Sequence, residues 1–196
     1  MNFIIATVFF LGYYAIIDDL IAVLFNENLI VAKSISFVIT LNEFVQYMRQ
    51  STIVFRDATG TFYNDRWKPL IEGLVNIVLS VILVKIVGVV GVIVATIITN
   101  LVICHIIEPY VIYSNAFKAS PKKHYIRNYG MILLFFISLV SLNFVMQSFD
   151  NKWIELLVNG CISVGISALI CVIELLLNRN ICKQFILLLR KGRVNS

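Results

Sequence analysis

Charged residues are scarce in this chain, and their scarcity argues against an ordinary water-soluble domain. Asp, Glu, Lys and Arg make up 14% of the 196 residues, hydrophobic residues make up 60%, and the mean hydropathy is +0.91. A soluble domain of this length usually contains about 25% charged and about 45–50% apolar residues. The three prolines and nine glycines are also too few for a disordered or low-complexity chain. The composition therefore indicates a membrane protein.

The residues of common catalytic sites are also scarce. The chain has two histidines and contains no GxSxG, HExxH or P-loop motif. Its four cysteines show neither CxxC spacing nor the spacing of zinc ligands. Cys104 and His105 are neighbours on a predicted helix, so their side chains point about 100° apart and cannot pair with each other. His105 could meet Cys161 or Cys171 from another helix, but nothing in the spacing requires it. We therefore expect no enzyme activity, no metal site and no cofactor.

Long apolar runs dominate what the chain does contain. Each run is close to the roughly 20 residues that an α-helix needs to cross a bilayer. Transmembrane strands are excluded, because they span only about ten residues and alternate polar with apolar positions. The sequence thus predicts an all-α polytopic membrane protein with about six transmembrane helices, at about Asn2–Phe25, Leu29–Met48, Pro69–Val87, Val89–Tyr113, Tyr129–Gln147 and Trp153–Leu177.

The positive charges gather on alternate connections, which predicts the orientation of the helices. Of the 16 Lys and Arg residues, only Lys33, Lys85 and Lys152 fall on the other set of connections. The positive-inside rule places both termini in the cytoplasm, and the net charge of +5 then reflects topology, so no nucleic-acid partner is expected. We divide the chain into a transmembrane lobe, residues 1–177, and a basic amphipathic tail, residues 178–196, which is expected to lie on the inner leaflet.

Polar residues inside the predicted helices point to a hydrated path. Ser36, Thr40, Glu43, Tyr47 and Gln50 recur every three or four residues, so they fall within an arc of roughly 80° on the second helix. A carboxylate inside a membrane helix is expensive and usually faces a bundle interior or water. The alternative is that Glu43 snorkels to the interface and that the hydroxyl groups only join helices.

Further polar residues lie toward the same cytoplasmic ends of the third and fourth helices. The candidates there are Glu72, Asn76, Asn100, His105 and Glu108. The connector between the second and third helices carries basic residues beside them. Arginine binds phosphate with two hydrogen bonds and lysine binds it as a point charge, so this vestibule is suited to an anionic headgroup. The predicted substrate-binding basic residues are Arg49, Arg56, Arg66 and Lys68.

Four features of the sequence concern packing and helix ends. Gly88 and Gly91 predict a tight turn between the third and fourth helices. The pairs Cys161/Gly165 and Ser163/Ser167 place small residues four apart, which permits close helix contact. The adjacent Asp18 and Asp19 are expected to mark the outer end of a short first helix.

Residues 48–113 resemble a known family. The matching features are FRDATG…NDRWKP in the connector, an E-x-x-x-N helix, a K-x-x-G-x-x-G turn and the segment Glu108-Pro109-Tyr110. They are similar to the C-terminal half of bacterial polysaccharide-repeat flippases, in the multidrug/oligosaccharidyl-lipid/polysaccharide exporter superfamily. The remainder of the chain matches more loosely.

The resemblance implies a transporter of two helical lobes around a central cavity. Such proteins move undecaprenyl-pyrophosphate-linked oligosaccharides across the bacterial cytoplasmic membrane by alternating access. This chain supplies about one lobe, so we expect it to be incomplete alone. Its expected partners are the lipid-linked oligosaccharide, membrane lipids, and a missing N-terminal lobe or a second copy. The alternative is a non-transporting membrane scaffold in glycan assembly.

Overall fold

The computed structural model describes residues 2–25, 32–146, 148–149 and 151–177, which contain helices and no strand. The predicted all-α polytopic architecture is confirmed for this part of the chain. The 3-10 helix η2 (Thr61–Asp65) and the π-helical turns η3 (Asn100–Cys104) and η4 (Tyr113–Phe117) supplement the α-helices. These helices are α1 (Asn2–Leu24), α2 (Lys33–Ala58), α3 (Lys68–Val87), α4 (Val89–Thr99), α5 (His105–Ile112), α6 (Lys122–Val145) and α7 (Lys152–Leu177).

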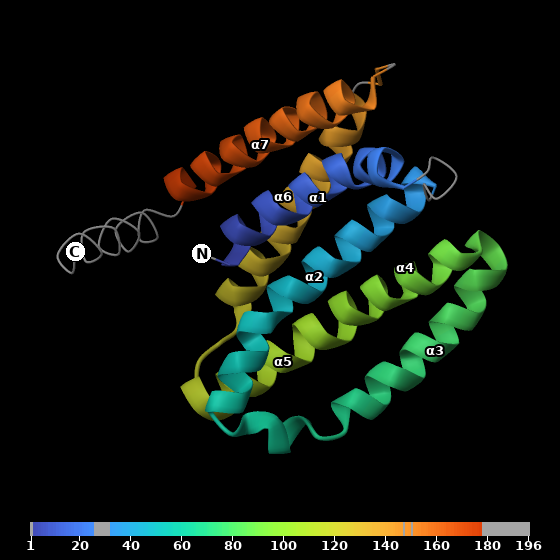
Figure 1. Ribbon diagram of the computed structural model, residues 1–196. Helices are drawn as coiled ribbons and strands as arrows, with labels where there is room; N and C mark the ends of the chain where they lie inside the picture. The colour runs from blue at the N-terminus through green and yellow to red at the C-terminus, as the bar shows by residue number, and fades with distance from the viewer. Residues whose placement is uncertain (1, 26–31, 147, 150, 178–196) are drawn as a thin grey trace.

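Within the described residues, five helical stretches are long and apolar enough to cross a membrane. One of them, Val89–Phe117, joins α4, η3, α5 and η4 into a single long helix, and the others lie in α1, α3, α6 and α7. α2 is more polar and is not among these five, but it packs against both α1 and α4. The helices run up and down through the bundle (Figure 1).

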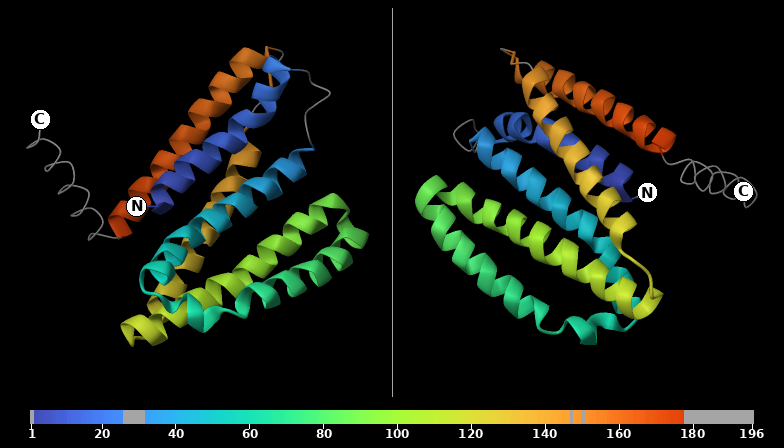
Figure 2. Two further views of the ribbon diagram at one scale, coloured as in Figure 1. Left: turned by 60° about the horizontal axis from the view of Figure 1, so that its bottom comes forward. Right: turned by 180° about the vertical axis from the view of Figure 1, so that it is seen from behind.

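Figures 1 and 2 show the order of the helices across the bundle, from α7 and α1 at one edge through α2 and α4 to α3 at the other. Seen from behind, α6 crosses over α1 and α2 (Figure 2), and it contacts both. The name "basic end" is used below for the end where α2 and α5 finish and α3 and α6 begin. It carries Arg49, Arg56, Arg66, Lys68, Lys118, Lys122, Lys123 and Arg127.

The hydrophobic core lies where α1, α2 and α6 meet. Phe44 of α2 stacks on Phe135 of α6 with ring centroids 3.6 Å apart, and both rings are fully buried. Leu11 and Tyr14 of α1 complete the same cluster. Aromatic pairs add attraction beyond the area that they bury, so this contact fixes α2 at the centre of the lobe.

The predicted tight turn between the third and fourth helices is confirmed. Gly88 ends α3 and precedes α4, with φ 68° and ψ −149°, a conformation that side chains disfavour. α3 and α4 then pack side by side as a hairpin. Lys68 is the only buried residue of α3, so this helix lies at the edge of the bundle.

Several predicted helix ends were wrong. α1 does not finish at the aspartate pair but continues to Leu24. Asp19 is buried within it and accepts a hydrogen bond from Asn159 of α7 at 3.2 Å, which compensates a carboxylate inside the helix. α2 continues past Met48 to Ala58, so half of the expected loop is helical. α6 begins at Lys122, about two turns before the predicted start at Tyr129.

The small-residue pairs of α7 divide between two faces. Ser163 and Ser167 are buried, and their hydroxyl groups donate to carbonyls of their own helix. Cys161 and Gly165 face outward instead, and a Cβ added at Gly165 would meet nothing within 4 Å. The helix contact predicted for this second pair is therefore absent from the described bundle. The predicted tail, residues 178–196, lies outside the described residues.

Candidate charged site

A fully buried carboxylate, Glu108, lies at the centre of a charged cluster at the basic end. Arg49 of α2 donates to it through Nε, at 2.8 Å to Oε1 and 3.0 Å to Oε2, and its Nη2 lies 2.7 Å from Oε1. The Lys68 ammonium donates to Oε1 as well. A carboxylate without exposure to water needs such partners, because desolvation otherwise disfavours its charged form.

Arg49 connects this carboxylate to two further helical segments. Its Nη1 donates to the amide oxygen of Asn100 at 3.0 Å and lies 3.4 Å from the Glu72 carboxylate. The guanidinium therefore joins α2 to α3, η3 and α5. Arginine suits this position because its planar fork offers five donors in fixed directions.

Lys68 is the second cation of the cluster, and it is 3% exposed. Besides Glu108 it contacts Glu72, one turn further along α3, at 3.0 Å. Pro69 occupies the first turn of the same helix, where its missing N–H costs no hydrogen bond. The Lys68–Glu108 pair thus holds the start of α3 against α5, and Glu72 contacts the same ammonium from within α3.

Arg56 and Asp65 form the outer part of the cluster. Arg56 Nη1 lies 3.3 Å from Asp65 Oδ2 and 3.8 Å from Glu108 Oε1. Burial raises the pKa of the Asp65 carboxyl, and the charges of Arg56 and Lys68 oppose that rise. The sequence did not identify Asp65 as a site residue. Its position three residues before Lys68 in the connector was the available signal.

The π-helical turn η3 explains how Asn100 and Glu108 reach the same guanidinium. On a regular α-helix, residues eight apart point about 80° away from each other. A π turn takes up roughly one extra residue, which removes about 100° and leaves the two side chains within about 20° of one direction. Pro109 follows in α5 and has no N–H to donate to the carbonyl four residues before it. The irregular backbone thus aligns this helix with Arg49.

The cluster contains three cations and four carboxylates. Arg49, Arg56 and Lys68 contact Asp65, Glu72 and Glu108 at 3.8 Å or less, and Arg56 also contacts the exposed Asp57 at 3.2 Å. Among the three inner carboxylates, Glu72 is the most exposed, with 26% of its side chain accessible. Together these groups form one network that connects α2, η2, α3 and the Val89–Phe117 helix.

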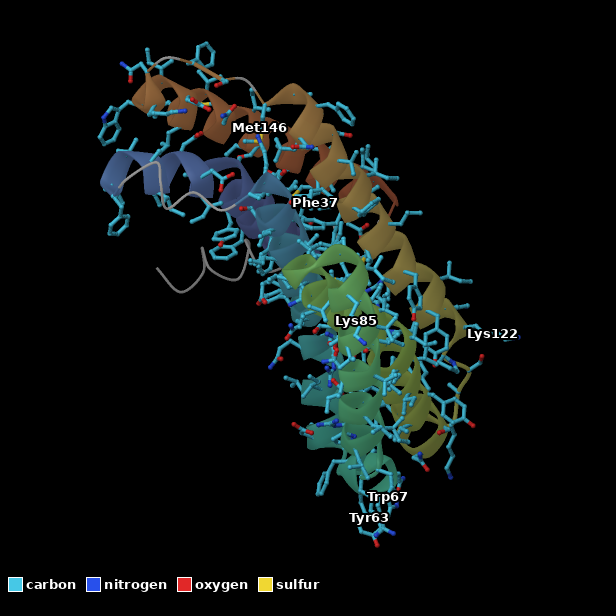
Figure 3. The ribbon with its side chains drawn as sticks, turned by 90° about the vertical axis from the view of Figure 1, so that its right-hand side faces the viewer. Phe37, Tyr63, Trp67, Lys85, Lys122 and Met146 are labelled. Atoms are coloured by element: carbon cyan, nitrogen blue, oxygen red, sulfur yellow. The ribbon has the colours of Figure 1, made fainter. Side chains whose placement is uncertain are left out.

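Four predicted site residues lie outside the network: Arg66, Glu43, Asn76 and His105. Arg66 is exposed and bonds to the Tyr63 hydroxyl at 3.2 Å, with its guanidinium over the Tyr63 and Trp67 rings. Figure 3 places Tyr63 and Trp67 at the lower tip of the molecule. Glu43 is exposed on α2, where Asn42 donates to it. Asn76 accepts a hydrogen bond from Ser80 within α3.

His105 is buried on another side of the long helix. Its Nε2 bonds to the Val45 carbonyl at 3.1 Å, and its Nδ1 lies 2.7 Å from the Asn128 amide nitrogen. With Nε2 protonated, the ring donates to α2 and accepts from α6. Both ring nitrogens therefore have structural partners, and neither bonds to a cysteine in the described part of the chain.

Neither a family model, a curated protein nor a solved structure matches this chain. The flippase resemblance of residues 48–113 therefore stays a prediction. The geometry of the charged cluster and of the helices that carry it is the basis for a proposed function.

Replacing His105 by phenylalanine should lower the unfolding free energy by about 1–3 kcal/mol, because the Asn128 amide would stay buried without its acceptor. Thermal unfolding of the purified chain in detergent measures this. Tyr125→Phe is the matched control, since it removes a single hydrogen bond to the Ile106 carbonyl from a residue nearer the surface. Equal stability of the His105 variant and the wild type would contradict the structural role.

Proposed function

We propose that this chain is the C-terminal lobe of a flippase that moves a lipid-linked oligosaccharide across the bacterial cytoplasmic membrane by alternating access. A second lobe completes the path. The observation that carries the proposal is the charged cluster around Glu108, which lies inside a bundle of membrane-crossing helices. Ionisable groups at such positions are costly and usually mark the path of a substrate or an ion.

The outward face of α2 supports a second lobe. Glu43, Gln46 and Gln50 are exposed there, at spacings of three and four residues. α2 packs against its apolar neighbours α1 and α4, so a lone lobe would turn this polar stripe toward lipid, where polar groups find no partners. A facing lobe would enclose the stripe in a shared aqueous cavity.

The cluster suggests how the path would handle a diphosphate. In the closed arrangement, Glu72 and Glu108 neutralise Arg49 and Lys68. A diphosphate entering from the basic end competes with these carboxylates for the same donors, and arginine accommodates phosphate with two hydrogen bonds. Exchange of partners between carboxylate and phosphate would link substrate binding to movement of α3 against α5.

One observation favours the second candidate, a scaffold that does not transport. The cations of the cluster are already matched by carboxylates, and a satisfied network also serves simply to hold helices together. A scaffold would need these contacts to persist, whereas a flippase would need them to open.

Complementation separates the two candidates. The chain is expressed with and without a homologous N-terminal half in a strain that lacks its own flippase, and exported polysaccharide is measured. We expect export only when both halves are present. The scaffold would be favoured if the chain improves glycan assembly only in strains that keep their own flippase and never restores export in a strain that lacks it.

Charge reversal then tests the path itself. Arg66→Glu changes an exposed residue at the basic end, and Lys85→Glu changes an exposed residue near the far end of α3, so their net charge changes are equal. We expect the Arg66 variant to lower export several-fold at unchanged protein level, because it repels the incoming diphosphate. The Lys85 variant should export normally. Equal export by both variants would refute the role of the basic end.

A further inference from the structure

A cavity of about 520 Å³ opens at the basic end, apart from the charged cluster. It is bounded by the first turn of α1 and by parts of α2, α5, η4 and α6, and no ionised residue of the cluster lines it. About half of the side chains that line it are apolar, with Phe3, Phe55, Phe117 and Met131 among them. The rest of the lining is polar, and it includes Ser51 and Thr52 of α2 and the α6 residues His124, Arg127 and Asn128. This volume falls in the range of small-molecule sites, roughly 300–1,000 Å³.

A second cavity, of about 460 Å³, lies on the other side of α6 and reaches α7. Its walls include Ile126, Leu134 and Ile173. Arg127 and Met131 line both cavities, so the first turns of α6 stand between two hollows, of which the second is the more apolar. The Glu174 carboxylate lines the second cavity, with one oxygen lacking a hydrogen-bond partner in the described chain.

The α6 residues between these hollows carry unused hydrogen-bonding capacity. Lys122, Lys123 and Arg127 are exposed, and they form no ion pair with the other described residues. The Nε2 atom of His124 is buried without a hydrogen-bond partner in the same part of the chain. Figure 3 shows Lys122 at the outer side of the bundle, away from Tyr63 and Trp67. A cationic surface beside hollows with apolar walls on part of their lining is complementary to an anionic amphiphile.

The position of α6 narrows the class of amphiphile. α6 is long and apolar enough to cross the membrane, so its first turns lie where headgroups meet acyl chains. Basic pockets between helices at this depth suit lipid phosphates. Most residues that line the second cavity are apolar, so it suits a hydrocarbon chain, whereas Lys123 and Arg127, which also line it, are the cations available to a phosphate.

We propose that the start of α6 binds an anionic phospholipid. Lys123, His124 and Arg127 hold the phosphate, and the acyl chains lie in the two hollows that share Met131. The site is separate from the proposed path for the oligosaccharide, and it stands whether or not the chain takes part in transport. The bound lipid would fill the space between α6 and its neighbours α1 and α7 and stabilise their packing.

The test uses the full chain, delipidated in non-ionic detergent and titrated with phosphatidylglycerol or phosphatidylcholine. Bound lipid is counted by native mass spectrometry, and the unfolding temperature is recorded in parallel. We expect phosphatidylglycerol to bind and to raise the unfolding temperature, whereas phosphatidylcholine should do neither. Arg127→Gln should weaken phosphatidylglycerol binding about tenfold, as expected for loss of a charged hydrogen bond.

Two further variants keep the result interpretable. Lys123→Gln changes an exposed residue and should also weaken binding, so it replaces Arg127→Gln if the latter fails to fold. Arg66→Gln removes one positive charge from the same end and should leave binding unchanged. The proposal is overturned if Arg66→Gln weakens binding as much as the α6 variants, if both lipids bind equally, or if inorganic phosphate alone displaces the lipid completely.

Discussion

Replacing Glu108 by glutamine should lower the unfolding free energy by about 3–5 kcal/mol, the cost of breaking a buried ion pair from one side. The carboxylate is fully buried and accepts hydrogen bonds from both Arg49 and Lys68. Glutamine has nearly the same shape but no charge, so it leaves two cations without their main partner in a dry part of the bundle. The Lys68 ammonium loses the most stabilisation, because it is 3% exposed and water cannot solvate it in place of the carboxylate.

Unfolding of this variant can be followed through a thiol. Cys104 is fully buried in η3, so it reacts with a maleimide dye only when the cluster opens. The measurement uses a background in which Cys161, Cys171 and Cys182 are replaced by alanine. Glu72→Gln is the matched control, since the Glu72 side chain is 26% exposed and its loss should cost roughly 1 kcal/mol or less.

A double variant makes the test specific to charge. Removing the Lys68 ammonium as well, in Glu108→Gln with Lys68→Met, should recover part of the lost stability because an unpaired buried cation disappears. If the double variant instead loses as much stability as the Glu108→Gln and Lys68→Met variants combined, Glu108 stabilises the bundle through packing rather than through its ion pairs.

Much of the fold could be predicted from the sequence because its signals are local. An apolar run of about twenty residues defines a helix without knowledge of its neighbours, and Gly88 defines the turn after α3. The true end of α2 was not predictable in this way. Its last turns carry Arg49 and Arg56, whose charges are compensated by Glu108, which is distant in sequence, and by Asp65, which lies beyond the end of the helix.

The candidate site was predictable as a set of residues but not as a set of contacts. Arg49, Lys68, Glu72, Asn100 and Glu108 were all identified, since ionisable or amide groups in apolar helices are conspicuous. Their arrangement depends on the π turn η3, which no simple periodicity reveals. The same limitation explains why His105 was grouped with them, although it faces Val45 and Asn128.

Gly91→Ala should destabilise the α3–α4 hairpin, by about 1–3 kcal/mol or more. A Cβ at this position would overlap the Leu83 carbonyl oxygen and lie 2.5 Å from its carbon. These are backbone atoms of α3, so no flexible side chain can move aside and the two helices must separate. Because α3 packs against α4 and η3, separation also pulls Lys68 and Glu72 from the cluster.

Gly73→Ala provides a control of opposite expected sign in the same hairpin. A Cβ at Gly73 would meet nothing within 4 Å, and alanine favours a helix over glycine by about 1 kcal/mol, so this variant should be neutral or more stable. Thermal unfolding and Cys104 labelling measure both variants. Early labelling of Cys104 in the Gly91 variant alone would connect the turn to the charged cluster through α3. Equal unfolding temperatures for the two variants would show that the helices are not in the close contact that the backbone geometry requires.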